Sequence, residues 1–275
     1  MTTVVAWVSY SPTGELPELP RAAYLASDSR ITWGSQLRRW DAGRKIFSAV
    51  SQPHVFGYSG DVVFPSLVLG QLVSAIDQGI LFGPEESHQD KNALIFESMR
   101  TSHRRRHNVV EQDFSVLHIC RWREWPATAF AAWLITYKRD GGVWACQELA
   151  IPTATKLIST LGSGANSART HAGRWNASNV GGTSRAIFSA FCDAVASNDD
   201  ALSGGLPQLA GLYTEGPPRN LGFIEDGSAF LHGLQIKPGA ALASIEWRDK
   251  LFQRIDPTTM LPFQGARRFA RPQLG

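Results

Sequence analysis

The chain has 275 residues, of which 43% are apolar and 19% are charged, with 25 Gly and 15 Pro. This composition is typical of an ordinary globular protein of one or at most two domains, and it excludes the disordered, collagen-like and disulfide-stapled classes. The longest nearly unbroken apolar stretch, residues 127–137, is well short of the roughly 18 residues that a membrane-spanning helix needs. We therefore expect no membrane anchor.

The net charge of +3 is unevenly distributed along the chain. Four arginines lie in residues 100–106 and three in residues 267–271, and without these seven charges the remainder would carry −4. Because no aromatic residues are interleaved with the first cluster, a solvated helix end or a docking surface is favoured over nucleic-acid binding. The start of the chain lacks the basic residues of a secretory signal, so we expect a cytoplasmic location.

The cysteines and histidines give no metal-site pattern. Cys120, Cys146 and Cys192 are scattered through apolar runs, and we expect buried free thiols in a reducing compartment. His118 and Cys120 share one face of a predicted strand, but no second His/Cys pair accompanies them, so no zinc site is expected.

In chain order, short apolar runs predict strands at 4–8 and 22–26 around a Pro/Gly-rich loop at 11–20, then a hairpin of 45–50 and 54–58. Helical spacing predicts helices over 61–80 and 92–103. Strands return at 114–120, 127–137, 143–151 and 156–161, followed by a helix over 183–197, one or two closing strands within 212–236 and a tail from 245 with little periodicity. This segregation of strands from helices predicts an α+β layered sandwich.

The second residue, Thr2, carries a hydroxyl group of chemical interest. A small residue behind Met1 favours removal of the methionine, and we expect no propeptide before Thr2. Trimming would leave Thr2 with a free α-amine, whose reference pKa is about 7.7 to 8.0. A single residue could then supply both the nucleophile and the general base. Alone, this feature is weak, because many proteins begin Met-Thr.

Five separated motifs accompany Thr2: Ala26-Ser27-Asp28-Ser29-Arg30, then Lys45, Gly60, Leu161-Gly162-Ser163-Gly164 and Asp200-Ala201-Leu202-Ser203-Gly204-Gly205. Their order and spacing resemble the proteasome β-subunit and HslV family of threonine-type N-terminal nucleophile hydrolases. The resemblance covers roughly residues 2–236 and leaves 100–112 and the tail from about 245 without a counterpart. It implies a four-layer αββα sandwich with the site between two sheets, in a domain over 1–244 followed by a C-terminal extension over 245–275.

The resemblance also implies a role for each matching residue. Thr2 Oγ would attack the substrate carbonyl, with the Thr2 amine as base and Lys45 as a neighbouring cation. Asp28 would hold Lys45, and the Gly60 N–H would donate to the oxyanion. The hydrogen-bonded network around the amine would be formed by Ser163, Asp200 and Ser203. The substrate pocket maps onto Ile31, Gly43, Phe47, Tyr58 and Val62.

The implied activity is hydrolysis of amide bonds through an acyl-enzyme on Thr2, on peptides or unfolded protein, with no metal or organic cofactor. A homo-oligomeric ring or spiral and an AAA+ ATPase partner are also implied. Three alternatives stay open: a catalytically silent structural subunit, a small-molecule amidase, and a nucleic-acid-binding protein that uses the arginine clusters. Taken singly, each matching residue also fits an ordinary structural role. Asp61, directly after Gly60, places a carboxylate near the expected oxyanion site.

Overall fold

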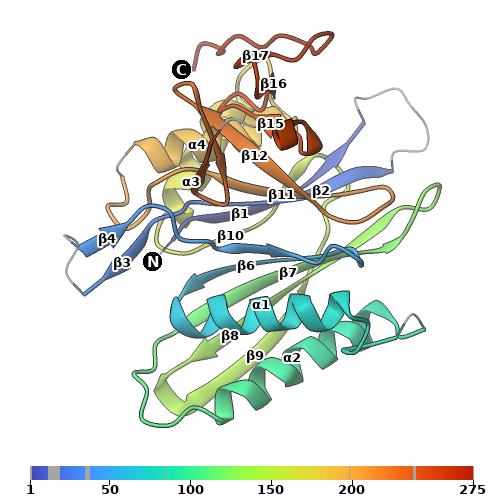
Figure 1. The fold of residues 1–275 in the computed structure, drawn as a ribbon, viewed down its shortest axis with the longest axis vertical. Coiled ribbons are helices and arrows are strands. Elements are labelled where there is room, and N and C mark those ends of the chain that lie inside the picture. Colours follow the sequence, from blue (N-terminus) through green and yellow to red (C-terminus); the bar gives the residue numbers. More distant parts are fainter. Residues whose placement is uncertain are drawn as a thin grey trace.

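Two β-sheets lie face to face in the computed structural model, and helices cover the outer face of each sheet (Figure 1). The structure describes residues 2–11, 19–34, 38–83, 85–197, 199–237 and 240–274. The predicted loop at 11–20 therefore lies mostly outside the described residues. The larger sheet runs in the order β10-β1-β2-β11-β12-β15-β16-β17, with β13 and β14 attached to β12. The smaller sheet runs in the order β5-β6-β7-β8-β9, and β3 and β4 form a separate hairpin.

The strands of the larger sheet are β1 (Val4–Tyr10), β2 (Pro20–Ser27), β10 (Lys156–Leu161), β11 (Gln208–Tyr213), β12 (Arg219–Glu225), β13 (Ser228–Leu231), β14 (Leu234–Ile236), β15 (Trp247–Arg248), β16 (Arg254–Asp256) and β17 (Leu261–Pro262). The smaller sheet contains β5 (Ile46–Ser48), β6 (His54–Gly60), β7 (Phe114–Arg123), β8 (Ala129–Lys138) and β9 (Val143–Leu149). The hairpin consists of β3 (Ile31–Trp33) and β4 (Arg38–Trp40), and the helices are α1 (Val63–Asp77), α2 (His88–Arg104), α3 (Ala165–Asn176) and α4 (Ser184–Ala196).

Strand β1 shows why the layers stack in this way. Its residues Val4, Ala6 and Val8 belong to the apolar cluster between the two sheets, whereas Val5 and Trp7 belong to the cluster under α3 and α4. A strand that is buried on both faces reads as a continuous apolar run, which is the pattern of the first residues of this chain. A third cluster lies between the smaller sheet and helices α1 and α2.

Capping residues and apolar faces explain which helices can be predicted from the sequence and where they start. Ser87 caps α2 by accepting a hydrogen bond from Asp90 N at 3.1 Å, and Thr183 caps α4 by accepting one from Ala186 N at 3.2 Å. These caps start α2 four residues before the predicted position and α4 one residue after it. Helix α3 is not predicted, because its buried face consists of two alanines and Trp175 and gives little periodic signal.

The mixed α and β composition is confirmed, but three local expectations are wrong. The region 212–236, predicted to hold one or two closing strands, contains the end of β11 and all of β12, β13 and β14. The region described as an aperiodic tail contains β15 to β17, and β15 pairs with β12 of the larger sheet. Cys146 is exposed, because β9 is the edge strand of its sheet, while Cys120 and Cys192 are buried free thiols. In the described part of the chain, no helix is long and apolar enough to cross a membrane.

A buried pair of imidazoles lies in the smaller sheet. His54 Nδ1 is 2.9 Å from His118 Nε2, and His118 Nδ1 is 2.9 Å from Asn92 Oδ1. An amide oxygen only accepts, so His118 donates to Asn92 and His54 donates to His118, with both rings neutral. Burial lowers the pKa of His54 to about 3 and lowers the pKa of His118 well below its usual value.

These two histidines predict a loss of stability in acid. The unfolded chain takes up two protons as the pH falls through about 6.5, whereas the folded chain resists until much lower pH. At about 1.4 kcal/mol per pH unit for each ring, these two rings are expected to contribute about 4 kcal/mol to the fall in the free energy of unfolding between pH 7 and pH 5. His232, whose pKa burial lowers to about 3, adds to the fall. Urea unfolding at the two pH values measures this loss. An unfolding free energy that is equal at pH 7 and pH 5 would contradict the neutral pair.

Candidate functional site

The start of β1 meets two loops that are far away in sequence. Thr2 N donates to Ser163 Oγ at 3.3 Å, and Thr2 is only 1% exposed. Ser163 Oγ donates to Asp200 Oδ2 at 2.6 Å, and Ser203 Oγ donates to the same oxygen at 2.7 Å. The Asp200 carboxylate therefore orients two hydroxyl groups, one of which faces the nitrogen of Thr2.

The Gly-Ser-Gly turn lies directly against the first residues of β1. A Cβ at Gly162, which has φ +87°, would lie 1.8 Å from Thr2 O. A Cβ at Gly164 would lie 1.9 Å from Thr3 Oγ1. Any side chain at either glycine would push the turn away from Thr2 and Thr3, the two residues before β1. Both positions therefore require glycine for steric reasons. The close approach that the glycines permit places Ser163 next to Thr2.

A fully buried ion pair lies on the other side of this backbone. Lys45 Nζ is 2.8 Å from Asp28 Oδ1, and both side chains are 0% exposed. Asp28 Oδ1 also accepts from Thr3 N at 2.9 Å, and Asp28 Oδ2 accepts from Gly204 N at 3.0 Å and from Arg30 N at 3.2 Å. This carboxylate therefore ties the lysine, β1 and the loop after Ser203 together. Burial lowers the pKa of Lys45, and Asp28 opposes that shift.

Two further side chains support the site and are not in the sequence prediction. The guanidinium group of Arg30 pairs with both oxygens of Asp41, at 2.8 and 2.9 Å, and donates to Ser203 O at 3.0 Å. The hydrogen bonds to Asp41 raise the pKa of Arg30, so the guanidinium group stays protonated. Arg30 lies within the sequence motif quoted around Asp28. Its place in that motif is the feature of the sequence from which a role in the site could have been predicted.

Gln208 is the second supporting residue, and it is 1% exposed. Its Oε1 accepts from Lys45 N at 3.0 Å, and its Nε2 donates to Gly43 O at 2.7 Å. The amide thus fixes the backbone on which the buried lysine stands. No local pattern marks this glutamine, because its partners are more than 160 residues away in the chain.

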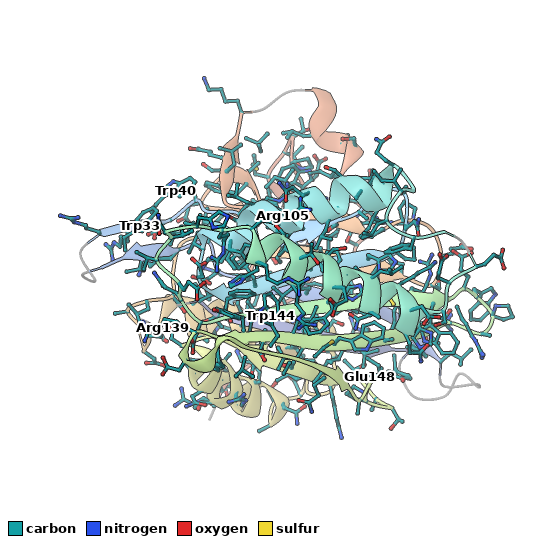
Figure 2. The ribbon with its side chains drawn as sticks, turned by 90° about the horizontal axis from the view of Figure 1, so that it is seen from below. Trp33, Trp40, Arg105, Arg139, Trp144 and Glu148 are labelled. Atoms are coloured by element: carbon teal, nitrogen blue, oxygen red, sulfur yellow. The ribbon has the colours of Figure 1, made fainter. Side chains whose placement is uncertain are left out.

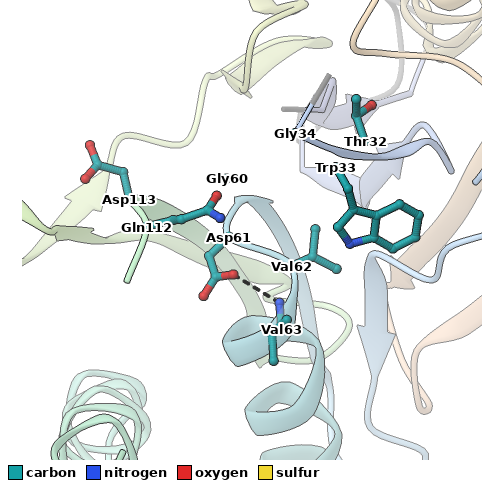
Figure 3. Close-up of a pocket in the computed structure, with 9 residues that line it drawn as sticks. All are labelled: Thr32, Trp33, Gly34, Gly60, Asp61, Val62, Val63, Gln112 and Asp113. Carbon is teal, nitrogen blue, oxygen red and sulfur yellow. Dashed lines mark hydrogen bonds between the residues drawn. The ribbon is translucent and has the colours of Figure 1, made fainter. Parts of the chain in front are cut away.

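Gly60 ends β6 beside a cavity of about 370 Å³ (Figure 3). The cavity is lined by Thr32, Trp33, Gly34, Gly60, Asp61, Val62, Val63, Gln112 and Asp113. Gly60 has φ +97°, and a Cβ there would lie 2.2 Å from Asp113 O. The backbone therefore requires glycine at this position whatever its chemical role.

The five residues of the predicted substrate pocket lie in different surroundings. Val62 lines the cavity beside Gly60. Ile31 lies over Gly43, because a Cβ on Gly43 would lie 2.1 Å from Ile31 Cδ1. Phe47 and Tyr58 have ring centroids 6.4 Å apart and belong to the core cluster next to α1. The role of this set in substrate binding stays a prediction.

Neither a protein-family model nor a curated protein sequence matches the chain. Among solved structures, the chain is similar to the crystal structure of eukaryotic HslV from Trypanosoma brucei, with 15% sequence identity and a TM-score of 0.47. The alignment covers 76% of this chain and 99% of that chain. Within the residues that the structure describes, no group of three or more His, Cys, Asp or Glu side chains is arranged to hold a metal ion.

The buried ion pair yields a stability prediction. Lys45→Met leaves the Asp28 carboxylate buried without its cation, and removing one partner of a buried pair typically costs about 3 to 5 kcal/mol. Lys138→Met is the matched control, because Lys138 forms an ion pair with Asp113 in which both side chains are more than half exposed. The control is expected to cost much less, because solvent screens an exposed ion pair. Urea unfolding compares the two variants, and equal losses would show that the Asp28–Lys45 pair does not stabilise the fold as argued.

Proposed function

We propose that this chain is a threonine-type N-terminal nucleophile hydrolase of the proteasome β-subunit and HslV kind, built as a four-layer αββα sandwich. It would cleave amide bonds of peptides or unfolded protein through an acyl-enzyme on Thr2. The observation that carries the proposal is the position of Thr2 N, 3.3 Å from a serine hydroxyl that is itself bound to Asp200. Ser163 and Asp200 match the motifs quoted from the sequence.

Removal of Met1 would turn the Thr2 peptide nitrogen into an α-amine at the same place. Because such an amine has a reference pKa near neutrality, it can accept the proton of Thr2 Oγ as that oxygen attacks the substrate carbonyl carbon. The same proton then passes to the departing nitrogen when the amide bond breaks, which leaves an ester on Thr2. Water hydrolyses the ester with the amine as base. Thr2 is almost fully buried in the chain that retains Met1, and we expect trimming to open its hydroxyl to substrate.

Lys45 would stabilise the negative charge that develops on Thr2 Oγ. A buried ammonium is effective in this role because little solvent screens it, and Asp28 holds it in place at 2.8 Å. Four donors fix Asp28 in turn: the lysine and the backbone N–H groups of Thr3, Arg30 and Gly204. The cation therefore has little freedom to move away.

The Gly60 N–H would donate to the oxyanion. Next to Gly60, the ladder bond to β7 runs from Asp61 N to Asp113 O at 2.9 Å, and Gly60 is paired with Phe114. Gly60 and Phe114 are therefore a non-hydrogen-bonded pair of the antiparallel ladder. In such a pair, the N–H of each residue is directed away from the partner strand, which supports the Gly60 N–H as an available donor. One oxyanion donor is typically worth about 2.7 to 4 kcal/mol of transition-state stabilisation.

The substrate would lie in the cavity between β3 and residues 60–63 (Figure 3). Strand β3 pairs with β4 along one edge in the described part of the chain, so an extended peptide could add to its other edge. On the strength of the resemblance, we also propose a cytoplasmic homo-oligomer in which an AAA+ ATPase feeds substrate. In this proposal the activity belongs to residues 1–244, and 245–275 are an extension.

Reaction with a peptide epoxyketone tests the proposal, because this electrophile needs both the hydroxyl and the amine of an N-terminal threonine. Intact-protein mass spectrometry is expected to show loss of Met1 and one label per chain on Thr2. Thr2→Ala is expected to abolish labelling, and Lys45→Met to slow it about 100-fold or more, whereas Lys156→Met, at an exposed position of β10, leaves it unchanged.

Each other outcome has a defined meaning. Retained Met1 without labelling would overturn the hydrolase and favour a silent structural subunit. Labelling together with turnover of small amides, but not of peptides or unfolded protein, would favour an amidase on the same fold. Labelling that survives Thr2→Ala would show that another residue is the nucleophile.

A further inference from the structure

The carboxylate directly after Gly60 has a cation partner from the basic segment that follows α2. Asp61 is 6% exposed, and its Oδ1 accepts from Val63 N at 3.1 Å at the start of α1. Its Oδ2 lies 3.9 Å from Arg106 Nη1. Asp61 therefore accepts a hydrogen bond from the first residue of α1 and faces a guanidinium group.

Arg106 is held in this position from several sides. Its guanidinium carbon lies 4.9 Å above the ring of Phe64, its Nη2 is 3.4 Å from Glu111 Oε1, and its Nη2 also contacts the ring of His103. Only 17% of the Arg106 side chain is exposed, whereas the neighbouring Arg105 is exposed (Figure 2).

The other charges near Arg106 have partners of their own. Burial and the nearby Arg106 both lower the pKa of His103, so this ring is neutral near pH 7. Tyr137 donates to Glu111 Oε2 at 2.5 Å, which lowers the pKa of Glu111. Asp113 accepts from Lys138 Nζ at 2.9 Å. Within the described residues, the cation that faces Asp61 is Arg106.

An unbalanced carboxylate at Asp61 would oppose the proposed chemistry. The oxyanion would form one residue away, at the Gly60 N–H, and the repulsion between two negative charges in a poorly solvated site is strong. It would also offset the favourable potential of the α1 N-terminus. A cation beside Asp61 reduces both effects.

We infer that Arg106 is a positioning residue of the proposed hydrolase, which neutralises Asp61 and keeps its carboxylate turned to the start of α1 and away from the oxyanion site. The inference rests on the proposed function. It assigns a role to one arginine of the segment 100–112, for which the family resemblance offers no counterpart. The other arginines of the segment differ: Arg100 pairs with Glu97, and Arg104 donates to Thr101 Oγ1.

Substitutions at Arg106 test this role. The variants are Arg106→Gln, Arg106→Lys, the double variant Arg106→Gln/Asp61→Asn, and the matched control Arg105→Gln, which removes an equal charge one residue away. An asparagine at 61 can still accept the hydrogen bond from Val63 N through its amide oxygen. For each full-length protein, we would measure kcat and KM for a fluorogenic peptide amide, the rate of epoxyketone labelling at Thr2, and Tm.

Arg106→Gln is expected to lower kcat and the labelling rate about 10- to 100-fold, less than the loss of a direct oxyanion donor, with KM little changed. The double variant is expected to recover most of this loss, because it removes the unbalanced carboxylate. Arg106→Lys is expected to keep most of the activity, and Arg105→Gln to match the wild type.

Two results would overturn the inference while the proposed function stands. In the first, the wild type is labelled at Thr2 and Arg106→Gln is as active as the wild type. In the second, the double variant folds but stays as slow as Arg106→Gln. If Arg106→Gln does not fold, the double variant and Arg106→Lys decide the question: slow but folded forms of both contradict the inference. A wild type that is not labelled at Thr2 overturns the proposed function, and the inference with it.

Discussion

The buried contact between Lys45 and Asp28 is the constraint on which the rest of this site depends. Two opposite charges with no solvent exposure are tolerated in a protein interior only when hydrogen bonds satisfy the remaining atoms. Asp28 meets this requirement by accepting from the backbone of Thr3 just before β1, of its own loop and of the loop after Ser203. The pair thereby fixes three segments that are remote in sequence, and it determines where the first residues of β1 lie.

The charges of the site are balanced in two separate places. On one side, Arg30 holds the loop that carries Ser203, and Asp41 neutralises its guanidinium group. On the other side, Arg106 faces Asp61 at the start of α1. Lys45 is fully buried beside Asp28, so little solvent screens its charge. This arrangement would allow negative charge to develop near Thr2 and Gly60 with little reorganisation of the protein.

The sequence predicts the elements whose signal is local. Strand β1 and helix α4 are evident from their apolar patterns, and the turn around Ser163 is evident from its glycines. Helix α3 is hidden because small residues form its buried face. Within the site, Gln208 and Arg106 could not be predicted, because a buried amide or guanidinium group acquires its role from partners that only the tertiary fold brings near.

The distance between Thr2 Oγ and Lys45 Nζ decides whether the proposed chemistry can take place. A high-resolution crystal structure of the protein after removal of Met1 would measure the separation of Thr2 Oγ and Lys45 Nζ, and the occupancy of waters around the new amine. The account predicts direct hydrogen-bond distance, about 3 Å, with Ser163 Oγ still bound to the Thr2 nitrogen. A lysine that lies beyond the reach of the hydroxyl even through one bridging water would contradict it.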